Sequence, residues 1–247
     1  MSKHMMSDSE TVAPKVADSE RKAKGDGASN SDPHFVQRRG FRYGCYVFTK
    51  RVFDLTVSAL FIIAFSWLYL ILAVLLKVSD GGKIFYKHKR VGKNGKDIYI
   101  RKFRSMVKDA DKIEAQLTPE QRALYEQEYK LDDDPRITKI GKILRKTSLD
   151  ELPNMFAVFT GAISLIGPRP IMREEAQIKY GKDMDKLLSV KPGMIGWWVV
   201  NGRNNCTYES GERQKAELYY VDHCSILLDI KILLLTFVKV IKREGAK

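Results

Sequence analysis

The longest uninterrupted hydrophobic stretch of the chain covers residues 55–76, which contain no charged side chain. An α-helix of these 22 residues is about 33 Å long, which is enough to cross the roughly 30 Å hydrocarbon core of a bilayer. A helix in the core of a soluble protein rarely stays apolar on every face over such a length. The pattern therefore predicts a membrane helix rather than a buried helix of a soluble domain.

Basic residues lie on both sides of this stretch. They are Arg38, Arg39, Arg42, Lys50 and Arg51 before it and Lys77, Lys83, Lys87, Lys89 and Arg90 after it. Lys and Arg favour the cytoplasmic side of a membrane, so a simple span is expected to carry them mainly at one end. Two basic ends favour a re-entrant helix that bends near its middle, where Ser66 can bond a backbone carbonyl. An ordinary span whose charged tail is translocated is the alternative.

A second apolar stretch lies near the carboxyl end, at residues 226–238. It is interrupted by Asp229 and Lys231 and is followed by Lys239, Lys242 and Arg243. This pattern favours an amphipathic helix at the membrane interface, with its basic residues at the level of the headgroups. A core helix of a soluble domain fits the same residues.

Strand signals follow the first hydrophobic stretch. Residues 84–87 predict a short strand, the Asn94-Gly95 pair predicts a hairpin turn, and residues 97–104 alternate as a second strand. The alternation places Lys102 and Arg104 on one face, so that two cations project together. A solvated strand face is the alternative interpretation of the two cations.

The rest of the chain is mainly helical in pattern. Residues 108–130 are charged and rich in Glu, Gln and Ala, with a helix start at Pro119, and residues 148–159 predict a short helix. Residues 161–166 predict a strand. The fold class is therefore α+β. We expect a disordered polar tail over residues 1–40, a membrane helix with basic flanks over 41–80, and a mostly helical cytosolic domain with a small β hairpin over 81–247.

The composition limits the classes of partner. The chain has 43 Lys and Arg against 30 Asp and Glu, a formal net charge of +13. Such a surplus indicates a polyanionic partner, which can be a nucleic acid, an anionic membrane surface or a phosphorylated substrate. The three cysteines and four histidines show no paired or clustered spacing, which argues against a disulfide framework and a His-based metal site.

Candidate chemistry is concentrated in two places. Asp150 and Glu151 are adjacent carboxylates, and a carboxylate can act as a nucleophile or hold a divalent metal. Arg169 lies between two prolines, which keep the backbone extended and stiff and so suit the guanidinium to phosphate. Together these residues indicate phosphoryl chemistry. The alternative is structural, since Ser148 and Glu151 have the spacing of a helix capping box.

An ordered set of short blocks resembles the monotopic phosphoglycosyl transferases, the bacterial sugar transferases that begin glycoconjugate assembly. The resemblance covers about residues 50–242, and its specificity comes from the order and spacing of the blocks. The blocks are Lys50-Arg51-Val52-Phe53-Asp54, Arg90-Val91-Gly92, Lys102-Phe103-Arg104-Ser105-Met106, Asp134-Pro135-Arg136-Ile137-Thr138, Leu149-Asp150-Glu151-Leu152-Pro153, Ser164-Leu165-Ile166-Gly167-Pro168-Arg169-Pro170, Lys191-Pro192-Gly193, Asn201-Gly202-Arg203 and Leu228-Asp229-Ile230-Lys231-Ile232.

The resemblance implies a reaction and roles for residues. A sugar-1-phosphate would pass from a UDP-sugar to undecaprenyl phosphate with release of UMP, through a covalent phosphosugar intermediate on Asp150. Glu151 would hold Mg²⁺. The cations expected to bind the diphosphate are Lys102, Arg104, Arg145, Arg169 and Arg203. The resemblance also implies a monotopic protein of the bacterial inner membrane with its catalytic domain facing the cytosol and no nucleic-acid partner. The sugar is left open, with a hexose such as galactose slightly favoured.

Several positions depart from the family's pattern. Trp67 stands where a proline usually follows the mid-membrane serine, and Ile195 and Val199 replace two polar residues expected near the site. Glu217 replaces an aspartate, and Ala157 replaces an asparagine. These changes bear on sugar specificity or rate. Two alternatives to the transferase follow from the charge and from the departures: a membrane-tethered protein that binds nucleic acid or anionic lipid, and a non-catalytic scaffold.

Overall fold

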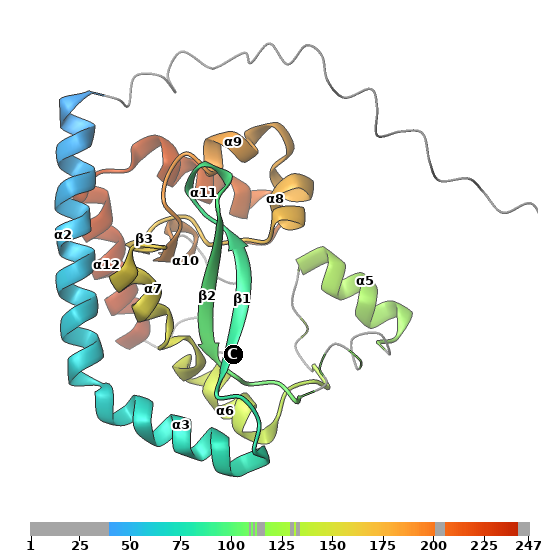
Figure 1. The fold of residues 1–247 in the computed structure, drawn as a ribbon. Helices are drawn as coiled ribbons and strands as arrows, with labels where there is room; N and C mark the ends of the chain where they lie inside the picture. Colours follow the sequence, from blue (N-terminus) through green and yellow to red (C-terminus); the bar gives the residue numbers. More distant parts are fainter. Residues whose placement is uncertain are drawn as a thin grey trace, which may run out of the picture. The chain divides into compact units, whose positions relative to one another are not determined.

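A computed structural model describes residues 40–108, 110, 112, 117–128, 131, 134–200 and 206–241. Apart from Gly40, the predicted tail over residues 1–40 lies outside these residues, as does Arg203. The described chain is mostly helical with a small antiparallel hairpin, which confirms the α+β class (Figure 1).

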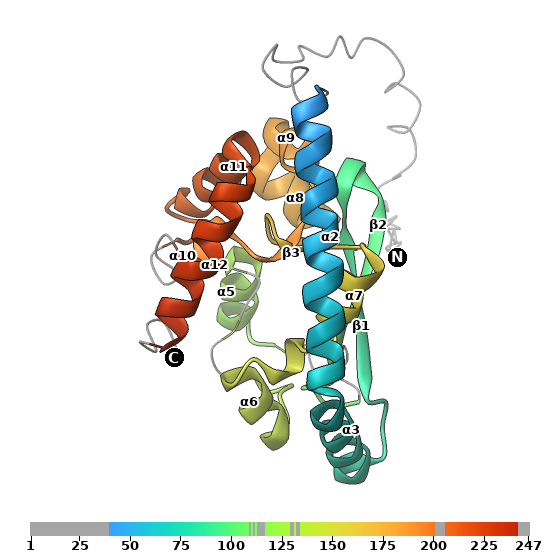
Figure 2. The ribbon, with the colours of Figure 1, turned by 90° about the vertical axis from the view of Figure 1, so that its left-hand side faces the viewer.

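The hydrophobic stretch forms two helices, α2 (Phe41–Ala64) and α3 (Ser66–Asp80), whose axes differ by 61°. Figure 1 shows the bend from the side, and Figure 2 shows α3 nearly end-on below α2. Phe65 leaves the helical region with φ −103° and ψ 11°, and the Ser66 hydroxyl donates to the Ile63 carbonyl at 2.9 Å. A serine that bonds backward along a helix in this way favours a bend without a proline. The predicted bend is therefore present. No single helix in the described part of the chain is both long and apolar enough to cross a membrane, and α2 and α3 meet these criteria only as a bent pair.

Polar side chains on α2 attach it to the rest of the molecule. Asp54, only 2% exposed, accepts a hydrogen bond from the Leu165 backbone N–H at 2.9 Å. Arg51 donates to the carbonyls of Val158 and Phe159 at 2.9 and 2.8 Å, at the end of α7 (Asn154–Thr160). A buried carboxylate and a guanidinium are stable there because backbone groups satisfy them. The helix pair is thus bonded to segments more than 100 residues away.

The predicted hairpin consists of β1 (Phe85–Val91) and β2 (Asp97–Phe103), paired antiparallel. Asn94 and Gly95 both have positive φ, 58° and 72°, as a tight hairpin turn of this hand requires. The prediction ended the first strand at residue 87, but pairing continues to Val91. The longer strand places Tyr86, His88 and Arg90 on the face that carries Lys102.

A second, parallel pair was not predicted: β3 (Ser164–Ile166) lies beside β4 (Gly193–Ile195). Strand β4 has only three residues, which are too few to show an alternation in the sequence. Gly193 permits the close approach of the strands, since a Cβ there would lie 2.1 Å from the Gly167 nitrogen. The Gly193 N–H donates to the Pro168 carbonyl at 2.7 Å, which ties β4 to the Gly-Pro-Arg-Pro loop.

The remaining helices surround these elements (Figure 1). They are α5 (Pro119–Glu128), α6 (Lys139–Lys146), α8 (Arg173–Tyr180), α9 (Met184–Leu187), α10 (Trp197–Val200), α11 (Glu212–His223) and α12 (Ile226–Ile241). The helix predicted to start at Pro119 is confirmed. Ile232 of α12 is fully buried in the main core, whereas Leu227, Leu234 and Phe237 of the same helix are 80%, 61% and 65% exposed. One face of α12 therefore packs in the core and another presents apolar side chains to the surroundings.

Candidate active site

The adjacent carboxylates Asp150 and Glu151 lie on a short 3₁₀ turn, η3 (Leu149–Glu151), between α6 and α7. Ser148 precedes the turn in the left-handed region, with φ 56° and ψ 18°, and its side chain makes no capping hydrogen bond. A capping box needs an extended residue at the helix start, so the capping interpretation of Ser148 and Glu151 is wrong. The left-handed residue turns the chain sharply after α6 and costs about 1–2 kcal/mol. Such local strain is frequent at functional sites.

Asp150 is a buried carboxylate, 7% exposed, with cations and a second carboxylate close by. Burial raises the pKa of Asp150 above its ordinary value, and the charge of Glu151 acts in the same direction. The charges of Lys102 and Arg145 oppose the increase in pKa. The side chain is therefore poorly solvated, a condition that strengthens its interactions with cations and with a phosphorus centre.

Two elements bring these cations to Asp150. Lys102 lies near the end of β2, and its ammonium group donates to Glu151 Oε1 at 2.5 Å. Arg145 lies in the last turn of α6, and its Nε donates to the Ser105 hydroxyl at 2.9 Å. Helix α6 packs closely on Ser105, since a Cβ at Gly141 would lie 1.9 Å from the Ser105 carbonyl oxygen. The end of the hairpin and α6 thus form one rigid support for the two carboxylates.

Arg104 follows β2 directly. Its guanidinium lies against Gly82, where an added Cβ would meet Nη1 at 2.2 Å. Lys102, two residues earlier, contacts Glu151 instead. The two cations that alternation placed together therefore contact different partners.

Arg169 lies in the Gly-Pro-Arg-Pro loop that follows β3. Its backbone N–H is shared between the two carboxylate oxygens of Glu217 on α11, at 3.2 Å each. The half-buried side chain is close enough to Arg90 and His88 to lower the pKa values of both. The loop therefore faces the hairpin side on which Lys102 also lies.

His88 and Arg90 are site residues that the sequence interpretation missed. They alternate with Tyr86 along β1, and His88 lies directly opposite Ile100, next to the pair of Tyr86 and Lys102. Burial, together with the charges of Arg90, Lys102 and Arg169, lowers the pKa of His88 to about 4. His88 is thus neutral at pH 7. The alternation was a usable signal, but it was lost because the first strand was ended at residue 87.

The described residues hold no cluster of three or more His, Cys, Asp or Glu side chains that could bind a metal by themselves. Asp150 and Glu151 supply two adjacent carboxylates, and the Lys102 ammonium already contacts Glu151 as a cation. Mg²⁺ commonly uses one or two protein carboxylates together with substrate phosphates. The donor set therefore fits Mg²⁺ bound jointly with a phosphorylated substrate.

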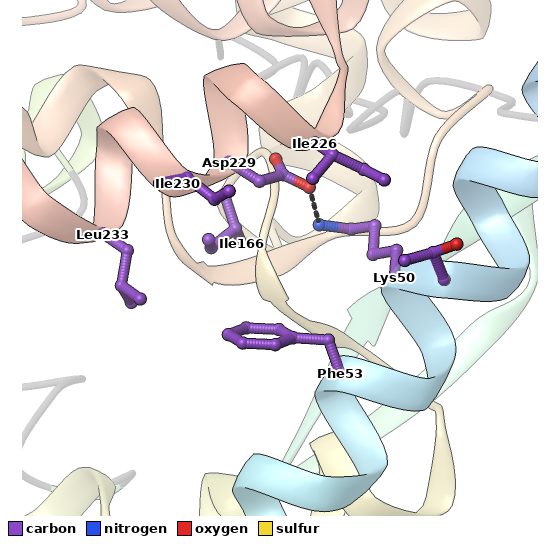
Figure 3. Close-up of a pocket in the computed structure, with 8 residues that line it drawn as sticks. Lys50, Phe53, Ile166, Ile226, Asp229, Ile230 and Leu233 are labelled. Carbon is purple, nitrogen blue, oxygen red and sulfur yellow. Dashed lines mark hydrogen bonds and ion pairs between the residues drawn. The ribbon is translucent and has the colours of Figure 1, made fainter.

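A separate apolar cavity of about 160 Å³ lies between α2 and α12 (Figure 3). Its lining residues are Thr49, Lys50, Phe53, Ile166, Ile226, Asp229, Ile230 and Leu233. At its edge Lys50 and Asp229 form an ion pair at 2.7 Å, and the hydroxyl of Tyr220 also donates to Asp229 at 2.7 Å. Ile166 lines the cavity and directly precedes the Gly-Pro-Arg-Pro loop. The cavity is thus lined by α2, α12 and the residue that directly precedes the Gly-Pro-Arg-Pro loop.

The bacterial sugar transferase family matches residues 45–243, which include every element described above except the first turn of α2. The chain belongs to this family. The match contains the carboxylate turn, the basic hairpin face and the Gly-Pro-Arg-Pro loop. The resemblance on which the sequence interpretation rested is therefore confirmed.

Three relatives show the range of the similarity. The chain is 43% identical over 203 residues to an undecaprenyl-phosphate galactose phosphotransferase of Salmonella typhimurium, covering 81% of this chain and 42% of that protein. It is 43% identical over 202 residues to a UDP-galactose-lipid carrier transferase of Erwinia amylovora, again 81% of this chain and 42% of the relative. It is 38% identical over 201 residues to the exopolysaccharide production protein ExoY of Sinorhizobium fredii, covering 80% and 88%. The chain thus spans less than half the length of the first two.

Proposed function

We propose that the protein transfers a sugar-1-phosphate from a UDP-sugar to undecaprenyl phosphate, in the first membrane step of exopolysaccharide or glycoconjugate synthesis. The observation that carries the proposal is the buried Asp150, placed beside Glu151 with the charges of Lys102 and Arg145 acting on it. The names of two relatives, a galactose phosphotransferase and a UDP-galactose-lipid carrier transferase, support the substrate classes. Galactose is the sugar favoured by these names.

The proposed reaction has two displacement steps at phosphorus. In the first step a carboxylate oxygen of Asp150 forms a bond to the β-phosphorus of the UDP-sugar, and the bond from that phosphorus to UMP breaks. In the second step a phosphate oxygen of the acceptor attacks the same phosphorus, and the bond to Asp150 breaks. The carboxylate is regenerated and undecaprenyl-diphosphate-sugar leaves. The covalent intermediate allows a soluble donor and a lipid acceptor to bind in turn.

Charge neutralisation is the main contribution of the surrounding residues. Lys102 and Arg145 act on Asp150 itself, and Arg169 acts from the loop facing the hairpin. We assign these cations to the diphosphate, because preorganised positive groups in a site of low dielectric constant stabilise developing negative charge. Arg104 and Arg203 belong to the same proposal, the latter from outside the described residues.

Mg²⁺ is the proposed cofactor, held by Glu151 together with the substrate. Bound there, it would withdraw negative charge from the phosphate oxygens. The Lys102 ammonium would give up its contact with Glu151 Oε1 and remain beside the substrate.

Release of UMP is the direct test of this function. Purified protein in detergent, given undecaprenyl phosphate, Mg²⁺ and a panel of UDP-sugars, is expected to release UMP with at least one donor, UDP-galactose first. Removing Mg²⁺ with EDTA should stop release, and adding it back should restore it. Absence of UMP with every donor would contradict the proposal. Salt-sensitive binding of nucleic acid by the same inactive protein would favour the alternative binding function.

We also propose that the protein is monotopic in the bacterial inner membrane, with α2 and α3 forming a re-entrant pair and the remaining domain in the cytosol. The support is the bend of 61° and the exposure of large apolar side chains along both helices and α12. On the helix pair these include Leu60, Ile63, Trp67, Leu70, Ile71 and Val74. Apolar surface of this extent is stable when lipid covers it.

The re-entrant topology predicts that both ends of the helix pair lie on one side of the membrane. The exposed Cys45 marks the first end in a protein with Cys206→Ser and Cys224→Ser. Lys83→Cys marks the second end in a protein that also carries Cys45→Ser. In intact spheroplasts neither single-cysteine protein is expected to react with an impermeant maleimide, whereas both should react after lysis. Labelling of Cys45 before lysis would show an ordinary span.

A further inference from the structure

The Gly-Pro-Arg-Pro loop has only one backbone donor at its centre. Pro168 and Pro170 carry no N–H, so Arg169 supplies the single N–H of this three-residue stretch. Both oxygens of Glu217 accept that N–H at 3.2 Å, and Glu217 is 1% exposed. The buried carboxylate of Glu217 therefore accepts its hydrogen bond from the backbone of Arg169 and not from the arginine side chain.

We propose that Glu217 is a positioning residue that fixes the phosphate-binding loop for the donor by holding the backbone N–H of Arg169. The inference rests on the proposed function. A hydrogen bond to a charged acceptor is about twice as strong as one between neutral groups. Loss of the Glu217 charge would therefore release the Arg169 N–H, the single backbone donor of the Pro168-Arg169-Pro170 stretch, and widen the range of positions that the Arg169 guanidinium samples.

The charges around Glu217 are consistent with this role. Arg213, one turn earlier on α11, is 5% exposed and stacks on Trp198 and Tyr208, with its guanidinium carbon 4.5 Å from each ring centre. Within the described part of the chain, its Nε and Nη2 atoms have no hydrogen-bond partner. The ionised Glu217 thus lies close to two guanidinium charges, those of Arg213 and Arg169.

Other groups also act on Glu217. Glu175 on α8 adds negative charge beside it, and Tyr180 at the end of α8 and Cys206 also interact with it electrostatically. Burial raises the pKa of Glu217 to about 7, although Arg169 and Arg213 oppose this shift. The carboxylate therefore takes up a proton as the pH falls through about 7. The hydrogen bond from the Arg169 N–H to Glu217 is expected to weaken over the same pH range.

The length of the side chain matters as well as its charge. The family's pattern has an aspartate at this position, and an aspartate on the same backbone would place its carboxylate about 1.5 Å farther back. The glutamate of this chain is therefore matched to the present distance between α11 and the loop. Comparing glutamine, which keeps the length, with aspartate, which keeps the charge, separates the two contributions.

The experiment measures kinetics and amide exchange on the full chain in detergent. For Glu217→Gln we expect the KM for the UDP-sugar to rise about tenfold and kcat to fall less than threefold, with the acceptor KM unchanged. In the wild type, kcat/KM for the donor is expected to fall as the pH decreases through about 7. This fall should disappear in Glu217→Gln, while any fall at lower pH that comes from protonation of Asp150 persists. Glu217→Asp should raise the donor KM but keep a pH-dependent fall in donor kcat/KM, because aspartate still titrates. The Arg169 amide should exchange at least about fivefold faster in both variants.

Glu212→Gln, at an exposed position on the same helix that pairs with Lys215, is the matched control and should leave every quantity unchanged. A Glu217→Gln enzyme with unchanged donor KM, an unchanged fall in donor kcat/KM near pH 7 and an unchanged Arg169 exchange rate would overturn the inference. Amide exchange is read without substrate. If no donor is turned over, the proposed reaction fails while the structural role of Glu217 is still decided.

Discussion

Replacing Asp150 with asparagine is expected to abolish turnover, with a loss of at least about 10³-fold in kcat. The amide keeps the size and shape of the carboxylate, but its oxygen is not an effective nucleophile at phosphorus. Protein given a UDP-sugar labelled in the sugar, without acceptor, should form a covalent adduct in the wild type and none in Asp150→Asn. The measurement is label retained on denatured protein, together with the rate of UMP release.

Stability separates this expectation from a folding defect. Burial raises the folded-state pKa of Asp150, so the ionised carboxylate opposes folding at pH values above its unfolded pKa. A neutral asparagine is therefore expected to keep or increase the melting temperature at pH 7. Asp185→Asn, an exposed change on α9, should leave adduct formation and turnover intact. A stable Asp150→Asn protein that still forms the adduct would overturn the nucleophilic role.

The Gly193→Ala variant is expected to lose about 3–5 kcal/mol of folding free energy, or to fail to fold. The added Cβ would lie 2.1 Å from the Gly167 nitrogen and 2.4 Å from the Ile166 carbonyl carbon, and both are backbone atoms. Relief requires β3 and β4 to separate, which breaks the Gly193–Pro168 and Gly167–Ile195 hydrogen bonds. Thermal unfolding in detergent should show a melting temperature lower by about 10 °C.

Gly44→Ala is the matched control for a glycine substitution. Gly44 lies inside α2, and nothing approaches within 4 Å of its added Cβ. Alanine is favoured over glycine in a helix by about 1 kcal/mol, so this variant should be slightly more stable. Equal melting temperatures for Gly193→Ala and the wild type would show that the two strands can move apart without cost.

The elements that could be predicted from the sequence are those whose signal is local. The Asn94-Gly95 pair and the alternation after it specify the hairpin turn, because only a few residue types accept positive φ at both positions. The long uncharged stretch specifies the helix pair, and Ser66 identifies the place of the bend. Asp150, Glu151 and Lys102 were also found from short-range patterns, and the structure brings them together.

The features that were missed depend on contacts between distant segments. Strand β4 has three residues, and its pairing with β3 is visible only when the fold is known. Glu217 is separated by 48 residues from the backbone N–H that it accepts. The capping interpretation failed for a related reason: the spacing of Ser148 and Glu151 does not reveal that the backbone at Ser148 is left-handed. Side-chain spacing carries no information on such backbone geometry.

The bonds that hold α2 impose an order on how the protein is made. Asp54 needs the amide of Leu165, and Lys50 needs Asp229, which lies 179 residues later in the chain. At synthesis rates of about 5–20 residues per second, Lys50 waits about 9–36 s for its partner. During this interval the apolar helices are already outside the ribosome while the domain that will secure them does not yet exist. In the proposed membrane topology, α2 and α3 can therefore insert before the rest of the protein folds, and truncated chains that end before α12 should expose Lys50 to proteolysis and chaperones.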